Sequence, residues 1–428
     1  MIRRFRVPRG ASSDSSAPWL SSPVIFWTMA ILVSAAFRLW SLELLSGRVP
    51  DGDAPYYLAI AQNMLSGRGI VLDYPDAMHN MRATYPPLYP TLLAGVGLII
   101  PLTLPVIAAV NTAFDFACAW LMSRLGKDLG EAPAGSLAAA LYIVWPTNLG
   151  MAAVARKEPL IAVLVMALLV VLVRTVTRGR WHHAALYGVL TGLLALTQPG
   201  LLFLPVLFAL VVLPSFPDWR RWLAMMGVAA GCATLTLLPW WIRNWLLLHR
   251  FVPLTAAAGY SLWVGSTPMG NGTWTQPPIE FRRGDEFQMS AALAVEAKRI
   301  IASDPVGYLV HCVVKFTRAM VNETRGVSQI YWARPNGHAL LARIWVGTAS
   351  LAQIVVLSTA LVAAVIRRKQ LLSQFLFAAI AQILVFGIWF EFDQRHRYFL
   401  TPLLLLVAVS GGFAYRAHRR ASAIASEA

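Results

Sequence analysis

Apolar residues run along this chain in long blocks that short polar or charged turns separate. A hydrocarbon layer of about 30 Å takes roughly 20 helical residues to cross, and runs approaching that length indicate membrane helices rather than soluble elements. The candidate spans lie near residues 23–44, 103–125, 134–154, 158–175, 184–199, 200–214, 222–242, 341–366, 371–390 and 397–415. The pattern predicts an all-α polytopic membrane protein with about ten transmembrane helices.

Composition agrees with this prediction. Apolar residues make up 57% of the 428 positions and the mean hydropathy is +0.60, more than one soluble core would hide. The net charge of +16 would suggest nucleic acid in a soluble protein, but Lys and Arg here flank the apolar runs, where they set orientation. We therefore expect no nucleic-acid partner. Three scattered cysteines, Cys118, Cys232 and Cys312, offer neither a disulfide framework nor a metal site.

Positive charge also predicts the topology. The N-terminal tail, residues 1–22, is basic and has no small-residue cleavage site close behind the first apolar run, so we expect an uncleaved cytoplasmic tail. The apolar segment 88–101, about 14 residues long, is short for a span. If it is re-entrant or interfacial, five cationic turns fall on the cytoplasmic side: 124–127, 174–180, 219–221, 367–369 and 416–420. If it crosses, there are eleven spans and the first three turns face outward.

The preferred ten-span topology divides the chain into five parts. They are the cytoplasmic tail 1–22, the N-terminal transmembrane module 23–242 with its outer loop 45–102, the outer region 243–340, the C-terminal helices 341–415 and the cytoplasmic tail 416–428. An outer region of about 100 residues is too long for an idle connection. Within it, apolar and charged positions alternate over 285–302 and 305–321, which predicts two amphipathic helices on the membrane surface.

The first outer loop holds the carboxylate of greatest chemical interest, Asp53. Behind it, Tyr57, Ile60, Ala61 and Met64 recur at the spacing of one helical face. An aspartate just before a helix can cap the backbone N–H groups, and that role alone would explain its type. A capped carboxylate would also be fixed at the membrane surface, where a general base meets a lipid headgroup. Both interpretations stay open.

A second acid lies inside a predicted span. Asp115 falls within 103–125, and an intramembrane carboxylate is a functional candidate by default. The first span carries Arg38 at a position where it can meet this acid. We therefore expect a structural ion pair between Asp115 and Arg38.

Four short segments carry a recognisable pattern. They are Asp53–Met64, Pro86–Pro90, Pro239–Asn244 and Arg397–Pro402. The first reads Asp-Ala-Pro-Tyr-Tyr-Leu-Ala-Ile-Ala-Gln-Asn-Met and the third reads Pro-Trp-Trp-Ile-Arg-Asn. In this order they resemble the polyprenyl-phosphate-dependent GT-C glycosyltransferases, which include the lipid A aminoarabinose transferases and the protein O-mannosyltransferases. The resemblance implies a GT-C fold with two large extracytoplasmic loops and juxtamembrane helices.

The resemblance also implies a reaction. A hexosyl or pentosyl group would move from a polyprenyl-phosphate donor to a hydroxyl of a glycan, lipid or protein acceptor, with inversion at the anomeric carbon. The site would face the periplasmic or extracellular side of a bacterial inner membrane, among membrane lipids, and no cofactor or metal is expected. Ala54 stands where many members have Glu, and Thr84 falls where lipid A transferases carry charged residues before the prolines. A lipid A acceptor is therefore less well supported than the reaction type.

Roles follow for individual residues. Asp53 would be the general base, and the leaving phosphate calls for cations rather than an acid. The candidate donor-phosphate-binding residues are Arg243, Arg397, Lys157 and Arg82. The candidate substrate-binding residues are Tyr57, Glu158, Tyr85, Trp263 and Tyr398. The competing interpretation of each cation is a snorkelling side chain at a helix end.

Two other functions fit a polytopic chain. A transporter or flippase of lipid-linked glycans would favour inverted repeats and broken helices that meet at mid-membrane polar sites, whereas the unusual residues here gather in two outer loops. A non-catalytic subunit of the same fold would keep the topology and make no product. Replacement of Asp53 separates these alternatives, because only a transferase would lose the formation of a covalent product.

Overall fold

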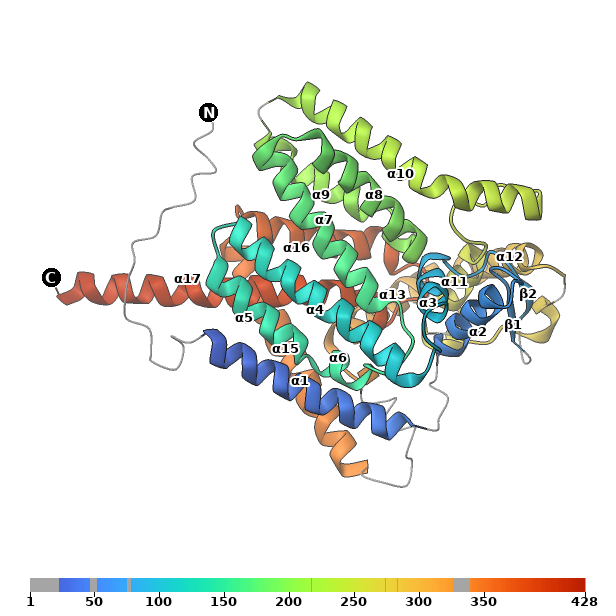
Figure 1. The fold of residues 1–428 in the computed structure, drawn as a ribbon, viewed down its shortest axis with the longest axis horizontal. Coiled ribbons are helices and arrows are strands. Elements are labelled where there is room, and N and C mark those ends of the chain that lie inside the picture. Colours follow the sequence, from blue (N-terminus) through green and yellow to red (C-terminus); the bar gives the residue numbers. More distant parts are fainter. Residues whose placement is uncertain are drawn as a thin grey trace.

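The computed structural model describes residues 23–46, 52–74, 78–216, 218–273, 275–282, 284–326 and 339–427; the predicted tail 1–22 lies outside them. Ten helices follow the predicted spans: α1 (Pro23–Leu45), α4 (Leu104–Asp128), α5 (Ala132–Ile143), α7 (Glu158–Arg178), α8 (Trp181–Thr197), α9 (Leu204–Val212), α10 (Trp219–Leu248), α15 (Ala339–Ile366), α16 (Leu371–Gln382) and α17 (Thr401–Glu427). They pack side by side as one bundle (Figure 1). The all-α prediction is confirmed for this part of the molecule.

Most of the other elements gather at one end of the bundle, at the right of Figure 1. They are α2 (Ala54–Leu65), α3 (Leu88–Gly97), α11 (Ala258–Ser266), α12 (Glu286–Ser303) and the strands β1 (Leu72–Tyr74) and β2 (Met78–Met81), whereas α6 (Pro146–Gly150) follows α5, near α1, and α13 (Pro305–Val321) lies nearer the centre. The two strands form an antiparallel hairpin with Leu72 opposite Met81. The predicted helices over 285–302 and 305–321 are confirmed as α12 and α13.

Six helices in the described ranges are long and apolar enough to cross a membrane. By length and composition these are α1, α4, α7, α10, α15 and the unit Gln394–Ser426 that contains most of α17. The helices α5, α8, α9 and α16 occupy the remaining predicted ranges but are shorter. The prediction of one continuous span over 134–154 is wrong, because α5 ends at Ile143 and a new short helix begins at Pro146. Proline lacks the N–H and its ring clashes with the preceding turn, so the helix breaks there.

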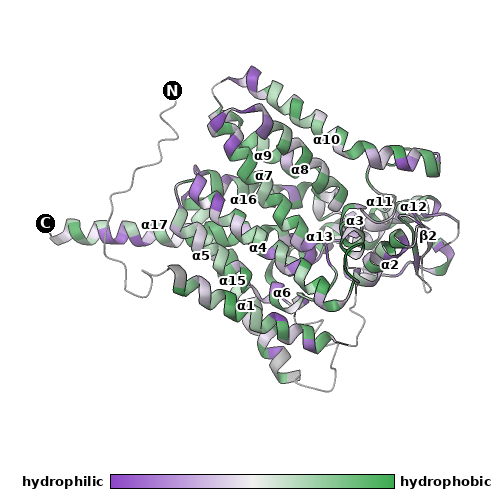
Figure 2. Cartoon of the chain, viewed as in Figure 1, coloured by the Kyte–Doolittle hydropathy of each residue, from purple (hydrophilic) through white to green (hydrophobic). Residues whose placement is uncertain are grey.

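The cationic turns lie together at the opposite end of the bundle from α2 and α11. Figure 2 shows polar residues at the left-hand ends of several helices. The contacts that join the turns are Arg174 Nε to Asp128 at 2.8 Å, Arg221 Nη2 to the carbonyl of Gly179 at 2.7 Å, and Arg367 Nη2 to Glu131 at 2.6 Å. This is the one-sided arrangement that the charge argument predicts.

The short helix α3 stays beside α2. Its ten residues span about 15 Å, half of a hydrocarbon layer. At its start, the Tyr89 ring lies 5.1 Å from that of Tyr57 in α2, and at its end a Cβ on Gly97 would come within 2.6 Å of Leu65, the last residue of α2. Both ends of α3 therefore rest on one helix, and α3 does not reach the cationic end of the bundle.

The helix α13 exposes its apolar face. Its buried face carries Tyr308, Cys312 and Lys315, whereas its exposed face carries Val306, Leu309, Val310, Val313 and Val314. A helix in water would hide these valines. An apolar face turned outward and a polar face turned inward is the pattern that contact with lipid favours.

The expected mid-membrane ion pair is present. Arg38 Nη2 in α1 donates to Asp115 Oδ2 in α4 at 2.7 Å, and both side chains are buried. Arg38 also donates to the hydroxyls of Ser34 and Thr112 at 3.0 and 3.1 Å, and Tyr142 donates to Asp115 at 3.4 Å. The pair is thus surrounded by partners from three helices, α1, α4 and α5, and clamps α1 to α4.

Candidate active site

Asp53 occupies the N-cap position of α2, but its side chain does not cap the helix. Its backbone is helical, with φ −79° and ψ −8°, and its carbonyl accepts the N–H of Tyr57 at 3.1 Å. The carboxylate turns away and accepts from Arg395 Nη1 at 2.5 Å. The interpretation of Asp53 as a side-chain cap is therefore wrong, and the carboxylate instead joins the first outer loop to the turn before α17.

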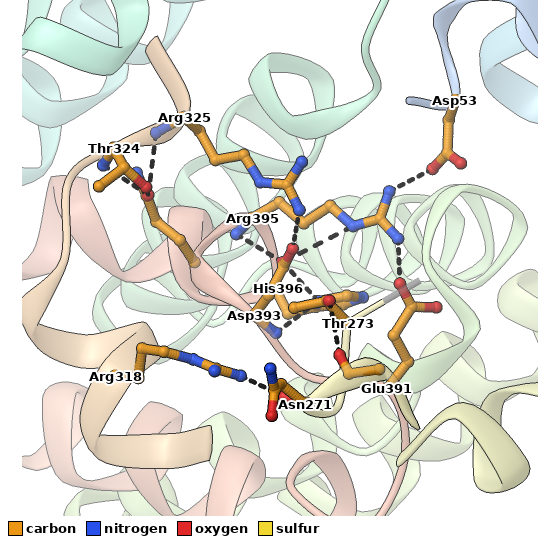
Figure 3. A network of polar contacts seen from close by, with 12 residues as sticks. Asp53, Asn271, Thr273, Arg318, Thr324, Arg325, Glu391, Asp393, Arg395 and His396 are labelled. Atoms are coloured by element: carbon orange, nitrogen blue, oxygen red, sulfur yellow. Dashed lines mark hydrogen bonds and ion pairs between the residues drawn. The ribbon is translucent and has the colours of Figure 1, made fainter. Parts of the chain in front are cut away.

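Arg395 holds three carboxylates together. Besides Asp53, its guanidinium forms an ion pair with Glu391 and lies 3.6 Å from Asp393 (Figure 3). Burial would raise the pKa of Asp393, but the hydrogen bond with His396 and the charges of Arg395 and Arg325 hold that pKa well below its usual range. Figure 3 shows the guanidinium of Arg395 between Asp53 and Glu391. Asp393 thus stays charged and positions the cation that contacts Asp53.

A large cavity opens beside Asp53. Its volume is about 470 Å³, within the size range of small-molecule sites. One part of its wall is charged and includes Asp53, Lys157, Glu158, Glu391 and Arg395. Another part is apolar and includes Ile161, Leu201, Phe203, Ile383 and Phe386. The cavity suits a ligand with a charged head and an apolar tail.

Lys157 is the cation of this cavity that is not already paired. It precedes α7, and its ammonium group forms no hydrogen bond or ion pair with any residue that the structure describes. Burial lowers its pKa, while the charges of Asp53 and Glu158 oppose that shift. An ammonium group in this position is free to meet an anion.

Two tyrosines of the large cavity offer hydroxyl groups. Burial, followed by the charge of Asp53, raises the pKa of both Tyr57 and Tyr85 well above the ordinary value, so both stay protonated. Their rings meet edge to face, with centroids 5.6 Å apart. The Tyr57 hydroxyl is buried and has no partner among the described residues. It is therefore available to a ligand as a hydrogen-bond donor.

A second, smaller cavity lies against the same carboxylate. Its volume is about 40 Å³, room for a few water-sized groups. It shares walls with the large cavity through Asp53, Tyr57, Glu158, Arg395 and Tyr398. Its other walls include Thr147, Arg156, Glu323, Arg325 and Arg397. Asp53 thus faces two spaces of different size and chemistry.

Several residues expected from the sequence are brought together here. Asp53, Tyr57, Glu158 and Tyr398 line both cavities, and Lys157 and Tyr85 line the large one. Arg397 lines the small cavity, but it is only 1% exposed. Its guanidinium is bonded to Glu323 and to the carbonyls of Ala319 and Asn322. Its charge is therefore already neutralised within the protein.

Three other expected residues lie away from both cavities. Arg243 donates to the carbonyls of Arg82 and Ile70, each at 2.8 Å, and its guanidinium stacks on Trp240. The Arg82 side chain donates to Asn80 at 3.0 Å. Trp263 is 2% exposed and packs in the core between α11 and α12. The structure does not bring these three to Asp53, because backbone carbonyls and packing already engage them.

The principal residues that the sequence did not single out are Arg395, Glu391 and Arg156. The dense charged turn from Glu391 to Arg397 is visible in the sequence, but it holds two arginines. The turn is a 3₁₀-helix over Gln394–Leu400, and with about three residues per turn the two arginines point to different neighbours. No spacing rule applied to the sequence alone would have chosen Arg395. No group of three or more His, Cys, Asp or Glu suited to a metal occurs among the described residues.

Comparisons with known proteins bear on the fold. No protein-family model and no curated protein matches the sequence. Among solved structures, the chain is similar to the oligosaccharyltransferase of Archaeoglobus fulgidus, crystallised with a tethered acceptor peptide containing the NVT sequon. The TM-score is 0.55 and the identity 14%, over 91% of this chain and 49% of that one. The chain has the GT-C fold.

A second solved structure is similar with a lower TM-score. ArnT from Cupriavidus metallidurans, bound to undecaprenyl phosphate, gives a TM-score of 0.43 and 13% identity over 93% of this chain and 78% of that one. The chain spans about half the length of the archaeal oligosaccharyltransferase. The similarity to the archaeal oligosaccharyltransferase confirms the fold expected from the four sequence segments, while the reaction has to be argued from the site.

Proposed function

We propose that this GT-C protein is a membrane glycosyltransferase that moves a sugar from a polyprenyl-phosphate donor to an acceptor hydroxyl, with Asp53 as general base. The observation that carries the proposal is the position of Asp53 in the wall of both cavities. A general base must reach the acceptor hydroxyl while the donor lies on the other side of the reacting hydroxyl oxygen. A carboxylate between two spaces meets that requirement.

The large cavity suits the donor. Its apolar wall near Phe203 and Phe386 would hold the start of the prenyl chain, and its charged wall would hold the phosphate. Negative charge grows on the phosphate oxygen as the glycosidic bond breaks, and cations placed there lower the barrier. Lys157 is unpaired in the described structure, and Arg395 can exchange one carboxylate for the phosphate while it keeps the others.

The small cavity suits the end of the acceptor that carries the hydroxyl. A hydroxyl entering there would lie beside Asp53, opposite the donor. Attack from the side opposite the leaving phosphate inverts the anomeric carbon, so the arrangement supports an inverting transfer. The base assignment corresponds to a contribution of about 10² to 10⁴ in rate.

The orientation of the bundle supports a site outside the cytoplasm. The cationic turns that favour the cytoplasmic side are joined at one end, and α2, which Asp53 immediately precedes, lies at the other end (Figure 1). We infer a multi-pass protein of a bacterial inner membrane with its site on the periplasmic or extracellular side. A donor carried by a membrane lipid would reach the large cavity from the bilayer.

The test uses membranes supplied with a polyprenyl-phosphate sugar. We expect Asp53→Asn and Asp53→Ala to lower the formation of glycosylated product by about 10² to 10⁴. The matched control is Asp73→Asn, which changes an exposed acid of the same outer loop that pairs with Arg68 at 3.8 Å and lines neither cavity. Full transfer by both Asp53 variants would refute the base assignment. Lipid-linked sugar that crosses the membrane without any covalent product would point to a transporter.

A further inference from the structure

Arg156 is a buried cation that the proposed chemistry at Asp53 leaves unused. It lies between α6 and α7 and is 4% exposed. Its Nη1 lies 3.7 Å from the sulfur of Met151, a weak acceptor. Its Nε and Nη2 have no partner among the described residues. A buried guanidinium with two unpaired nitrogens is costly, and such a group in a native protein calls for a ligand.

The other arginines of the small cavity are already engaged. Arg397 is paired with Glu323, Arg395 with Asp53 and Glu391, and Arg325 with Asp393. The guanidinium carbon of Arg156 instead lies 5.0 Å from the centre of the Tyr398 ring. An aromatic face supports the cation without neutralising it. In the described structure Arg156 forms no ion pair with a carboxylate, although it shares the cavity wall with Glu158.

The free nitrogens define the kind of ligand. Nε and Nη2 form one edge of the guanidinium, and this edge matches two oxygens of a carboxylate or a phosphate. The cavity of about 40 Å³ has room for one such group but not for a whole sugar. The ligand is therefore an anionic group at the tip of a larger molecule.

The linings of the two cavities separate the anion bound at Arg156 from the donor phosphate. Arg156 lines only the small cavity, the next residue Lys157 lines only the large one, and Glu158 lines both. Two neighbouring cations thus serve two different spaces. A phosphate on a prenyl chain belongs to the space with the apolar wall, which leaves Arg156 for a second anion.

We propose that Arg156 binds an anionic group of the acceptor, a phosphate or a carboxylate, and so presents the neighbouring hydroxyl to Asp53. This assignment rests on the proposed function, because it takes the small cavity as the acceptor side. It makes Arg156 a specificity-determining residue that selects acceptors with an anion next to the reactive hydroxyl.

The test measures binding, so it needs neither the natural sugar nor the natural acceptor. The full-length protein in phosphatidylcholine nanodiscs is saturated with undecaprenyl phosphate, and the thermal midpoint is followed as glycerol 3-phosphate or neutral glycerol is added at constant ionic strength. We expect a saturable rise with glycerol 3-phosphate and none with glycerol. Arg156→Gln should weaken the binding at least about tenfold, the loss expected for one charge-assisted contact.

Two further variants keep the result interpretable. Lys157→Gln should weaken the binding of undecaprenyl phosphate and leave the affinity for glycerol 3-phosphate within about twofold, since Lys157 lines only the large cavity. Arg68→Gln changes an exposed arginine that lines neither cavity and should leave glycerol 3-phosphate binding intact. The proposal is overturned if the thermal midpoint of the wild type shows no saturable response to glycerol 3-phosphate, or if undecaprenyl phosphate displaces glycerol 3-phosphate. It is also overturned if Lys157→Gln and Arg156→Gln weaken the binding of glycerol 3-phosphate equally. Failure of the proposed transfer would instead appear in the Asp53 product assay.

Discussion

Two aspartate–arginine pairs join distant parts of the chain, and their surroundings differ. Asp115 and Arg38 lie within the helical bundle at 2.7 Å, with side chains 0% and 6% exposed. Asp53 and Arg395 lie at the end of the bundle at 2.5 Å, with side chains 20% and 19% exposed. The first pair lines neither described cavity, whereas the second forms part of the wall of both.

The difference shows what separates a structural pair from a reactive one. Arg38 is paired with one carboxylate among the described residues, so loss of Asp115 would leave a buried charge unpaired. Arg395 also contacts Glu391 and Asp393. In the proposed reaction, an incoming phosphate can therefore draw Arg395 away from Asp53 and free an oxygen of the proposed base while the guanidinium stays neutralised. Access from a cavity and additional carboxylate partners distinguish the pair that we propose to be reactive, and both properties come from the surroundings of the two residues.

The largest effect is expected when the structural pair is broken. Asp115→Asn should lower the free energy of unfolding by about 3 to 5 kcal/mol, because it leaves Arg38 buried without its counter-charge. Transfer activity per folded molecule should stay close to that of the wild type. Thermal and denaturant unfolding of the purified protein in detergent measure the first quantity, and the product assay measures the second.

A double variant sharpens this result. Arg38→Met together with Asp115→Leu removes both charges and should recover most of the lost stability, since apolar residues often replace a buried pair without cost. If Asp115→Asn instead keeps its stability and loses transfer, the comparison of the two pairs fails and Asp115 belongs to the chemistry.

A smaller effect separates the two arginines of the charged turn. Arg395→Gln should lower transfer by about 10², the cost of losing one preorganised charge at the leaving group, with a smaller loss of stability than Arg397→Gln, because the Arg395 side chain is 19% exposed and that of Arg397 is 1% exposed. Arg397→Gln should mainly destabilise the fold, since Glu323 is 2% exposed and would lose its counter-charge. The product assay and thermal unfolding of each variant give both quantities. A loss of transfer confined to Arg397→Gln would restore Arg397 as the donor-phosphate residue expected from the sequence.

Much of the helical framework could be predicted from the sequence. Apolar length located the bundle, and the clustering of Arg and Lys placed the cationic turns at one end, because both signals depend on the membrane rather than on tertiary contacts. The Arg38–Asp115 pair was also predictable, since an intramembrane charge needs a partner and few are available. The break at Pro146 was missed because the apolar run continues on either side of it.

The site was predictable only in part. Asp53, Glu158 and Lys157 follow from local motifs near helix starts, and they line the cavities. The partner of Asp53 lies 342 positions away in the chain, and only the packing of the turn before α17 against α2 decides which arginine it meets. Arg243 and Trp263 were expected in the site from their motifs but lie outside both cavities. Arg243 is engaged by backbone carbonyls, and Trp263 is packed in the core.

The smallest expected effect concerns a buried cation that has carbonyl partners instead of a carboxylate. Lys315 Nζ donates to the carbonyls of Gly265 and Phe390 at 2.6 and 3.0 Å, and burial lowers its pKa from 10.5 to about 8. Between these values the unfolded chain binds more protons than the folded one, so stability should rise with pH, by at most about 1.4 kcal/mol per pH unit. Below pH 8 the amine is protonated in both states and this contribution no longer changes.

The measurement is the thermal midpoint of the detergent-solubilised protein from pH 7.5 to 10, compared between wild type and Lys315→Met. The matched control is Lys298→Met, which changes an exposed lysine of α12 and should follow the wild-type curve. Equal slopes for the wild type and Lys315→Met would mean that Lys315 titrates as a solvated lysine. In that case carbonyl partners alone would suffice to keep a charge on this buried amine. A buried cation would then not need several carboxylate partners, and the contrast between the two aspartate–arginine pairs would rest on access from a cavity rather than on the number of partners.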